Sequence, residues 1–359
     1  MSFADRLRAQ KARLQPTETI VRPMPVCQSG LEHEGLACLG GTIEPERSEE
    51  EAITRELAQQ CSRTLRQARH AVVYTGAGIS TATGISDYRG PDGVWTSLAT
   101  GRIPDDSFDL TAAAPSFAHM CIVKLIEIGL VKFCTSTNLD ALHYKSGLTP
   151  LQNLAELHGN KYVERCARCS KDFLRPFPIR RTATRETGRF CECGGSLTDS
   201  GIDFGQVLPI HHLALAQEHA TVADFSLVVG SSMRVRPASE LPVCGKKIAP
   251  DGTDGGGKAS LCIVNRMDTG LDERACIRSY GDADVFFKHL VRELGVEVDE
   301  PPQCKHLHSA MEMKVFATGF LPPSSGHYIG SKEKEQQLAE ALTQVETDLI
   351  TADASACDM

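Results

Sequence analysis

Short apolar runs recur along the middle of the chain and predict the buried strands of a sheet. They cover residues 71–75, 131–136, 225–229 and 261–264, and each is rich in residues that favour strands. The stretches between them are long enough to hold crossover helices. Apolar strands that alternate with helices are typical of a parallel sheet. The pattern therefore predicts an α/β fold with helices on both faces of the sheet.

Apolar residues at helical spacing predict three helices. The first begins near Ser48, which forms a capping box with Glu51. Its apolar face repeats every three or four residues: Ile53, Leu57, Cys61 and Leu65. The second helix covers about 117–128 and the third about 332–350. The third carries an apolar stripe that suits a packing face or a partner helix: Leu338, Leu342, Val345 and Leu349.

Two insertions interrupt the strand pattern. Residues 84–125 mix prolines, glycines and the start of a helix, and residues 161–200 hold four cysteines with few long apolar runs. The glycine-rich stretch 250–258 predicts a flexible surface loop between the last strands. Residues 1–47 are expected to form a poorly ordered N-terminal extension, and residues 298–359 a C-terminal extension.

Composition and charge exclude several classes of protein. The chain has 359 residues, of which 41% are hydrophobic, and this argues against a wholly disordered chain. Its net charge of -8 argues against a globally basic nucleic-acid binder. No apolar run approaches the ~18 residues of a membrane-spanning helix. The 14 cysteines are too sparse for a disulfide scaffold, so most are expected to be reduced thiols inside a cell.

The first residues of the chain are basic. Four cations face the single acid Asp5: Arg6, Arg8, Lys11 and Arg13. No apolar core follows them, so the segment is not a secretory signal. Three interpretations stay open: a weak organellar presequence, a basic arm for nuclear entry or contact with polyanions, and a solvated tail.

A glycine turn follows the first predicted strand. Gly76 and Gly78 lie between that strand and an expected helix, where bare backbone amides favour phosphate oxygens. Thr81 replaces the third glycine of the dehydrogenase fingerprint, and no acidic residue closes a second strand about 20 positions on. The turn suits a dinucleotide bound in another manner, or a plain strand-to-helix turn. The loop that follows carries Asp87, Arg89 and Trp95 among glycines and prolines, which suits closure over a ligand.

Four cysteines form two close pairs. Cys166 and Cys169 are three residues apart, and Cys191 and Cys193 are two apart. Four thiolates in two short-spaced pairs fit a tetrahedral structural zinc site that has no open position for catalysis. Reduced thiols without metal, or a redox pair, are the alternatives.

Several motifs together resemble the signature of the sirtuins, the NAD-dependent protein deacylases. These are GAGIS at 76–80, DYRGP at 87–91, GVWT at 93–96, TNLDALH at 137–143, ELHGN at 156–160, GSS at 230–232 and IVN at 263–265. The resemblance covers about residues 52–297. GVWT, ELHGN and GSSMRVRPASELP are most like the class IV branch, which includes nuclear, chromatin-directed members.

The resemblance implies a reaction and a set of site residues. The implied reaction removes an acyl group from lysine and consumes NAD as a co-substrate. His158 matches the family's catalytic histidine, Asn138 would orient the ribose or a water, and Asp140 would hold the nicotinamide end. The implied NAD-binding residues are Gly76, Ala77, Gly78, Ser80, Thr81, Asp87, Tyr88, Arg89, Trp95, Thr137, Asn138, Asp140, His158, Gly230, Ser231, Ser232, Asn265, Met267 and Ala283. Cys166, Cys169, Cys191 and Cys193 are the implied zinc ligands.

The resemblance also implies a division of the chain. A catalytic domain over 48–297 would combine a Rossmann-like sheet, from about 48–83, 126–160 and 201–297, with a small part. The small part would be built from a helical insertion at 84–125 and a zinc-binding domain at 161–200.

Three residues depart from the family pattern, and one of them, Ser86 in place of a common proline, is expected to be benign. Thr137 stands where the family carries glutamine, and the lost contact is expected to cost about 0.5–1.5 kcal/mol, or ~3 where a buried group is left unpaired. Ala141 replaces a glycine, which matters only if that position needs a positive φ.

Three functions stay open at this stage. The first is a lysine deacylase that produces nicotinamide, O-acyl-ADP-ribose and free lysine. The others are a weakly active NAD- or chromatin-binding scaffold and a protein mono-ADP-ribosyltransferase. Expected partners are acyl-lysine proteins, with histones and chromatin as candidates, and no membrane. A nuclear location is expected, with a cytoplasmic or organellar one as the alternative. No Tyr-x-x-Arg pair follows Trp95, so succinyl or malonyl preference is not expected.

Overall fold

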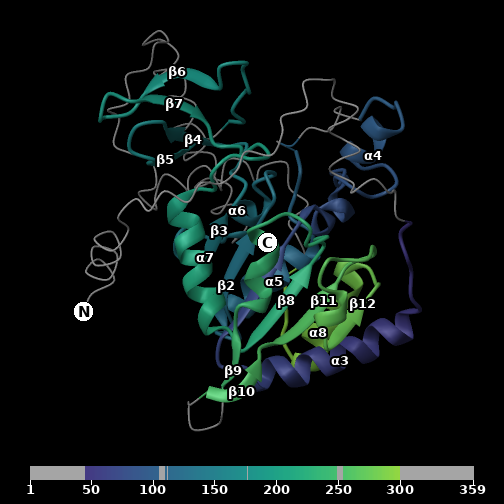
Figure 1. The fold of residues 1–359 in the computed structure, drawn as a ribbon. Coiled ribbons are helices and arrows are strands. Elements are labelled where there is room, and N and C mark those ends of the chain that lie inside the picture. Colours follow the sequence, from purple (N-terminus) through teal and green to yellow (C-terminus); the bar gives the residue numbers. More distant parts are fainter. Residues whose placement is uncertain (1–44, 105–109, 111, 176, 249–253, 300–359) are drawn as a thin grey trace, which may run out of the picture.

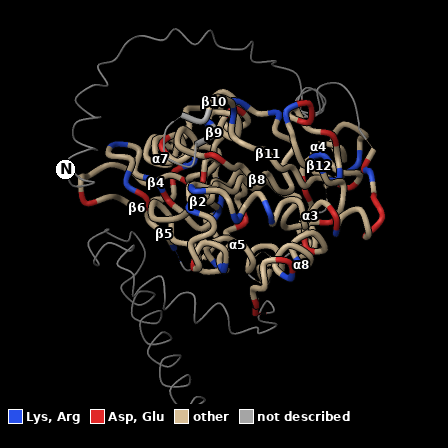
Figure 2. Tube along the Cα trace, turned by 90° about the horizontal axis from the view of Figure 1, so that it is seen from below, with Lys and Arg blue, Asp and Glu red and all other residues tan. Residues whose placement is uncertain are grey.

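The computed structural model describes residues 45–104, 110, 112–175, 177–248 and 254–299. The expectations for residues 1–44 and 300–359, including the helix at 332–350, lie outside the described residues. Among those described, no helix combines the length and apolar character needed to cross a bilayer. Basic and acidic residues are interspersed around the outside of the fold (Figure 2).

A six-stranded parallel sheet forms the centre of the molecule, with the strand order β12-β11-β8-β1-β2-β3 (Figure 1). Its strands are β1 (Ala71–Thr75), β2 (Val131–Ser136), β3 (Leu154–Glu156), β8 (Phe225–Val229), β11 (Ser260–Val264) and β12 (Ile277–Ser279). All four strands predicted from apolar runs are present. The predicted Rossmann-like class is confirmed.

Helices cover both faces of this sheet. The helices α3 (Glu51–Gln67), α5 (Phe117–Glu127) and α8 (Ala283–Leu294) bury their apolar residues in one core cluster with Val73 of β1. Helix α7 (Ile210–Val222) packs in the other cluster with Val72 and Tyr74. Because neighbouring residues of β1 point to opposite faces, one strand contributes to both cores. Figure 1 shows α7 on the side of the sheet opposite α3 and α8.

The first helix differs from its prediction in two ways. Its N-cap is Glu50, which makes no side-chain capping bond, so the capping box at Ser48 is wrong. The Glu49 carboxylate instead accepts hydrogen bonds from Thr54 Oγ1 at 2.8 Å and from Tyr280 N at 2.9 Å. The bond to Tyr280 ties the residue before the N-cap to a distant part of the chain. Ile53 is 47% exposed, so the buried face is turned away from it.

The cysteine-containing insertion folds as a separate antiparallel sheet, which we call the small module (Figure 1). Its four strands are β4 (Val163–Cys166), β5 (Asp172–Leu174), β6 (Glu186–Phe190) and β7 (Ser196–Asp199), in the order β5-β4-β7-β6. Glu164 is fully buried between two guanidinium groups, with Arg175 Nε and Arg189 Nε each 2.6 Å from its oxygens. A buried charge needs such partners.

The other insertion is divided between two places. Helix α4 (Val94–Ala99) carries Trp95. Helix α5 packs against β2 and α8 on the large sheet, so the second half of residues 84–125 belongs with the sheet's helical layer.

The stretch 250–258 is not wholly a loop. β10 (Asp254–Lys258) pairs antiparallel with β9 (Lys246–Ile248) in a two-stranded ribbon. The remaining short helices are α6 (Leu142–Ser146) and the 3-10 turns η1 (Ala77–Ile79), η2 (Thr81–Thr83), η3 (Ala238–Val243) and η4 (Asp272–Arg274).

Candidate active site

A cleft of about 400 Å³ lies at the carboxyl ends of the central strands, where ligands collect in open α/β sheets. The chain reaches it after β1, β2, β3, β8 and β11, and again after β7 of the small module. It brings together most of the residues implied by the family motifs: Gly76, Ala77, Gly78, Asp87, Tyr88, Arg89, Trp95, Thr137, His158, Gly230, Ser231, Ser232, Asn265 and Met267.

A smaller pocket adjoins this cleft and shares Gly78, Asp87 and Gly230 with it. It is lined by the two predicted residues Thr81 and Ala283. These two residues therefore line the smaller pocket and not the cleft that contains His158.

The glycine turn packs directly against the turn after β8. Gly78 N donates to Gly230 O at 2.8 Å, and a Cβ on Gly78 would lie 2.8 Å from the Gly230 Cα. Gly230 itself has a φ of +61°. Only residues without a side chain allow this approach. The helix expected after the turn takes the form of two short 3-10 helices, η1 and η2.

Three buried polar side chains lie together behind the turn. Ser80 Oγ donates to Asp140 Oδ2 at 2.7 Å, and Asn138 Nδ2 donates to Ser80 Oγ at 3.4 Å. Asn138 and Asp140 therefore point to the same side, as their spacing predicts. Among the described residues, no group bonds to the buried Asn138 Oδ1. A buried acceptor of this kind has the chemistry to accept a hydrogen bond from a ligand hydroxyl.

His158 is held from several directions. Its backbone carbonyl accepts from Ile202 N at 2.9 Å, and its neighbour Leu157 N donates to Ser136 O of β2 at 2.9 Å. Burial lowers the pKa of His158, while a hydrogen bond to the backbone of Thr137 acts in the opposite direction. The imidazole is therefore neutral at neutral pH, which is the form that accepts a proton.

The loop after the glycine turn forms an aromatic wall. The Trp95 ring stacks on Tyr88 with centroids 5.7 Å apart and lies 6.0 Å from Phe204. Burial raises the pKa of Asp87, whose Oδ1 accepts from Gly90 N at 2.8 Å. That contact folds the loop back on itself.

Two of the departures from the family pattern, at Ala141 and Thr137, have structural consequences. Ala141 has a φ of +64°, so this position does use the left-handed conformation that favours glycine. Thr137 Oγ1 donates to Thr75 O at 3.1 Å. Because that proton is used inside the protein, the hydroxyl offers a ligand only its lone pairs.

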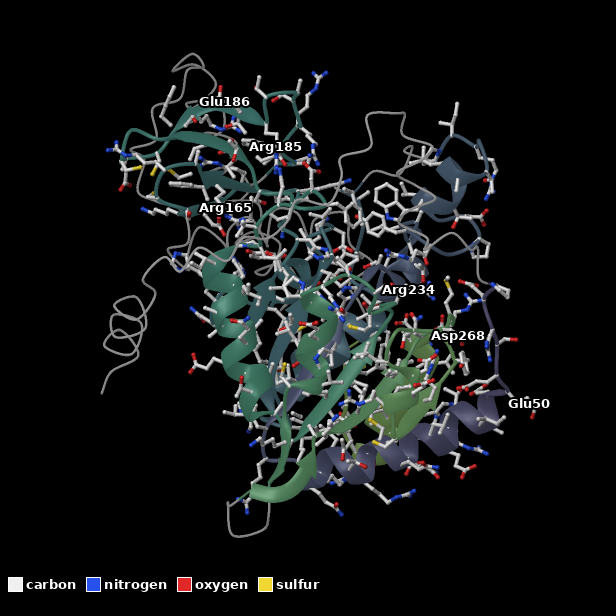
Figure 3. The ribbon with its side chains drawn as sticks, viewed as in Figure 1. Glu50, Arg165, Arg185, Glu186, Arg234 and Asp268 are labelled. Carbon is white, nitrogen blue, oxygen red and sulfur yellow. The ribbon has the colours of Figure 1, made fainter. Side chains whose placement is uncertain are left out.

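Sequence reasoning missed part of the cleft wall. The missed lining residues include Leu139, Arg181, Ile202, Asp203, Phe204, Gln206, Leu208, Arg234, Val235 and Arg236. Arg181 Nη2 pairs with Asp203 Oδ2 at 2.5 Å. Arg234 Nη2 donates to Asp268 O at 3.4 Å, and Figure 3 labels both of these residues. The arginines after β8 lie within the motif GSSMRVRPASELP, and this was the one available signal for them.

All four predicted zinc ligands come together in the small module. Their sulfur atoms lie within 4.8 Å of one another. Cys166 Sγ is 3.4 Å from Cys193 Sγ, and Cys169 Sγ is 3.6 Å from Cys191 Sγ. Sulfurs around a tetrahedral zinc at a Zn–S distance of about 2.3 Å are about 3.8 Å apart. The donor set therefore fits structural zinc.

The fold and this cleft define a two-part α/β protein with a nucleotide-type site and a four-cysteine metal module. The profile of the Sir2 family matches residues 105–237. The NAD-dependent protein deacetylase Sirt6 of Drosophila melanogaster is 34% identical over 71% of this chain and 81% of its own length. The chain belongs to the Sir2 family. Sirtuin-7 of Homo sapiens is 41% identical over 68% of this chain and 60% of its own length. This similarity confirms the resemblance to the class IV branch.

Solved structures agree with this assignment. A Sir2 protein with a deacetylated p53 peptide and 3'-O-acetyl ADP-ribose is 28% identical, with a TM-score of 0.52 over 67% of this chain and 99% of that chain. A Sir2 complex with a p53 peptide and NAD+ is 29% identical, with a TM-score of 0.50 over 66% of this chain and 98% of that chain. The chain spans 50% of the length of the NAD-dependent protein deacetylase SRT1 of Arabidopsis thaliana.

Proposed function

We propose that the chain is an NAD-dependent protein lysine deacetylase that releases nicotinamide, O-acetyl-ADP-ribose and free lysine. One observation carries the proposal: His158, the glycine turn at Gly76–Gly78 and Asn265 line a single cleft. Sir2 relatives that hold a p53 peptide with NAD+ or with an acetylated ADP-ribose support it. NAD supplies an electrophilic ribose carbon once its nicotinamide leaves.

The residues of the cleft fit a dinucleotide. The close-packed turns at Gly78 and Gly230 present backbone to the cleft without side chains, which suits phosphate oxygens. Asn138 is not itself a lining residue, but it lies between the lining residues Thr137 and Leu139, and its unpartnered Oδ1 suits a ribose hydroxyl or a water. We assign Ser80 and Asp140 to the nicotinamide end, since they bond to each other beside Asn138.

In this proposal His158 is the general base. Burial keeps its imidazole neutral, so it can take a proton from a ribose hydroxyl. The backbone of Thr137 orients the ring. The aromatic wall of Trp95, Tyr88 and Phe204 would exclude water from the reacting atoms.

The four cysteines would hold zinc as a structural ion. Their sulfurs leave no position for a substrate, and the ion would stabilise the small module without taking part in the reaction.

We also propose a division, a location and a substrate class. The catalytic domain would span 48–297, with residues 117–125 moved to the sheet part because α5 packs there. The similarity to sirtuin-7 supports a nuclear location and acetylated chromatin proteins, histones among them, as substrates. Microscopy of the tagged chain and a comparison of acetylated histone and non-histone peptides test these two points.

The decisive experiment is incubation of the purified, zinc-loaded chain with NAD and an acetyl-lysine peptide. We expect nicotinamide and O-acetyl-ADP-ribose in equal amounts. NAD-derived label on protein would instead indicate ADP-ribosyl transfer, and no peptide-dependent product would indicate a binding scaffold. A succinyl-lysine peptide in the same assay is expected to react more slowly, and efficient desuccinylation would overturn that expectation.

A further inference from the structure

Within the described residues, the strand β3 just before His158 pairs with another strand on one side only, and on its other side an isolated bridge joins Leu154 to Pro150. Leu157 N donates to Ser136 O of β2 at 2.9 Å, so the N–H of Glu156 points away from the sheet. It donates to Nδ1 of His212 on α7, at 3.0 Å. A buried backbone N–H needs an acceptor, which an edge strand cannot obtain from another strand. The His212 imidazole therefore takes the place of the missing strand.

The other side of the same ring reaches the small module. His212 Nε2 is 3.1 Å from Asp172 Oδ2 on β5. Because Nδ1 accepts a hydrogen bond from the backbone N–H of Glu156, Nε2 must carry the ring hydrogen and donate to Asp172. Asp172 is held in turn by Arg165 of β4, with Nε at 2.6 Å and Nη2 at 2.9 Å. Figure 3 shows Arg165 in the small module, above the top of α7.

His212 is only 4% exposed, so water does not replace these contacts. The Glu156 side chain is also fixed, since its Oε1 accepts from Asn160 Nδ2 at 2.7 Å. In sequence, His158 lies midway between Glu156 and Asn160, which these hydrogen bonds hold. Loss of the His212 ring would leave the Glu156 N–H buried without an acceptor. The backbone of Glu156 would then no longer be held by α7.

We propose that His212 is a positioning residue for His158, which links the small module to the catalytic segment. It acts through the backbone of Glu156 and does not touch the reacting atoms. Only the kinetic test of this proposal, which measures kcat and KM of deacetylation, rests on the proposed function. It predicts that the imidazole affects turnover more than substrate affinity, because it sets where the base stands and not how NAD or peptide binds.

The kinetic test compares His212→Leu with His211→Leu, a matched control at the exposed neighbouring position. We expect His212→Leu to lower kcat about 10- to 100-fold with KM for NAD and peptide within about twofold, and the control to match the wild type. His212→Asn keeps an acceptor near the position of Nδ1 and should recover most of kcat. His212→Gln, which reaches only towards Asp172, should not. A Leu variant with unchanged kcat, or with only KM altered, overturns the proposal.

A second readout does not depend on the reaction. Hydrogen exchange of the peptide over 154–160 should accelerate in His212→Leu, and in His212→Gln, but not in His212→Asn or His211→Leu. If the wild type makes no O-acetyl-ADP-ribose and exchange still follows this order, only the proposed function fails. If the wild type is active and exchange is the same in all variants, the positioning role is wrong. Should His212→Leu not fold, the Asn and Gln variants decide the question alone.

Discussion

The close approach of Gly159 to the end of the small module allows a sharp test of how the site is built. Gly159 has a φ of +86°, and a Cβ on it would lie 2.0 Å from Ser200 O. The segment after His158 and the segment after β7 therefore touch through their backbones. Gly188 has a similar φ of +77°, but a Cβ there would meet no atom within 4 Å. Gly188→Ala is thus a matched control for Gly159→Ala.

The two substitutions differ by the clash alone. Left-handed backbone costs alanine roughly 1–2 kcal/mol, and the stiffer unfolded chain returns roughly 0.4–1 kcal/mol, so Gly188→Ala should destabilise by about 1 kcal/mol. Overpacking against Ser200 adds roughly 1–3 kcal/mol to this, so Gly159→Ala should lower the free energy of unfolding by about 2–4 kcal/mol. It should also lower kcat, because relief of the clash moves His158.

Urea unfolding with zinc present measures the first quantity, and the acetyl-peptide assay measures the second. Gly188→Ala should keep wild-type turnover at a temperature where both variants are folded. Equal losses of stability in the two variants would refute the reasoning, since they would show that the approach to Ser200 does not constrain the backbone. Full turnover in Gly159→Ala would show that His158 tolerates the displacement.

Three further predictions concern the base, the metal and a buried ion pair. His158→Tyr should abolish turnover, while NAD should still change the fluorescence of Trp95, the single tryptophan. Because burial lowers the pKa of His158, kcat/KM of the wild type should fall on the acid side with a midpoint below pH 6.5. A midpoint above pH 6.5 would contradict the assignment of His158 as the base. The chain should contain one zinc per molecule by metal analysis, and a chelator should make the four clustered thiols reactive and stop turnover; a metal-free chain with full activity would exclude a structural ion. Glu164→Gln should lower the free energy of unfolding in denaturant by about 3–5 kcal/mol, because both guanidinium partners lose their counter-ion. Glu240→Gln, at an exposed pair with Arg236, should change it by less than about 1 kcal/mol.

The central strands could be predicted because each is apolar in sequence and buried from both sides. β1 and β8 are buried along their whole length, and four of the five residues in each are apolar, the exceptions being Thr75 and Ser226. β3 and β12 have three residues each, and such short strands leave no periodic pattern. Their presence depends on neighbours that the chain supplies elsewhere.

The wrong predictions have a common physical cause. The capping box at Ser48 is a local rule, and it fails because Glu49 bonds to Tyr280, 231 residues away. The glycine-rich stretch at 250–258 looks like a loop until β9 offers it a partner. Local chemistry favoured one conformation in both cases, and a tertiary contact favoured another.

Much of the cleft could be predicted, since backbone geometry and chemistry restrict the residue types there. Glycine is required where two turns touch, and this keeps Gly76 and Gly78 recognisable. The sequence also indicated that Ala141, in place of a glycine, matters only if its φ is positive. The structure shows that this φ is +64°. Phe204 stayed hidden because a single aromatic residue in a polar loop has no distinctive spacing.

His212 shows most clearly where pattern reasoning stops. Adjacent histidines at the start of a helix have the same local surroundings in sequence, and helix propensity treats them alike. In the fold, His211 is exposed while His212 is 4% exposed and bonds to a residue 56 positions earlier. The difference arises from the open edge of β3, whose unpaired N–H selects one of the two rings. A side chain that completes a strand edge can therefore be recognised only after the order of the strands is known.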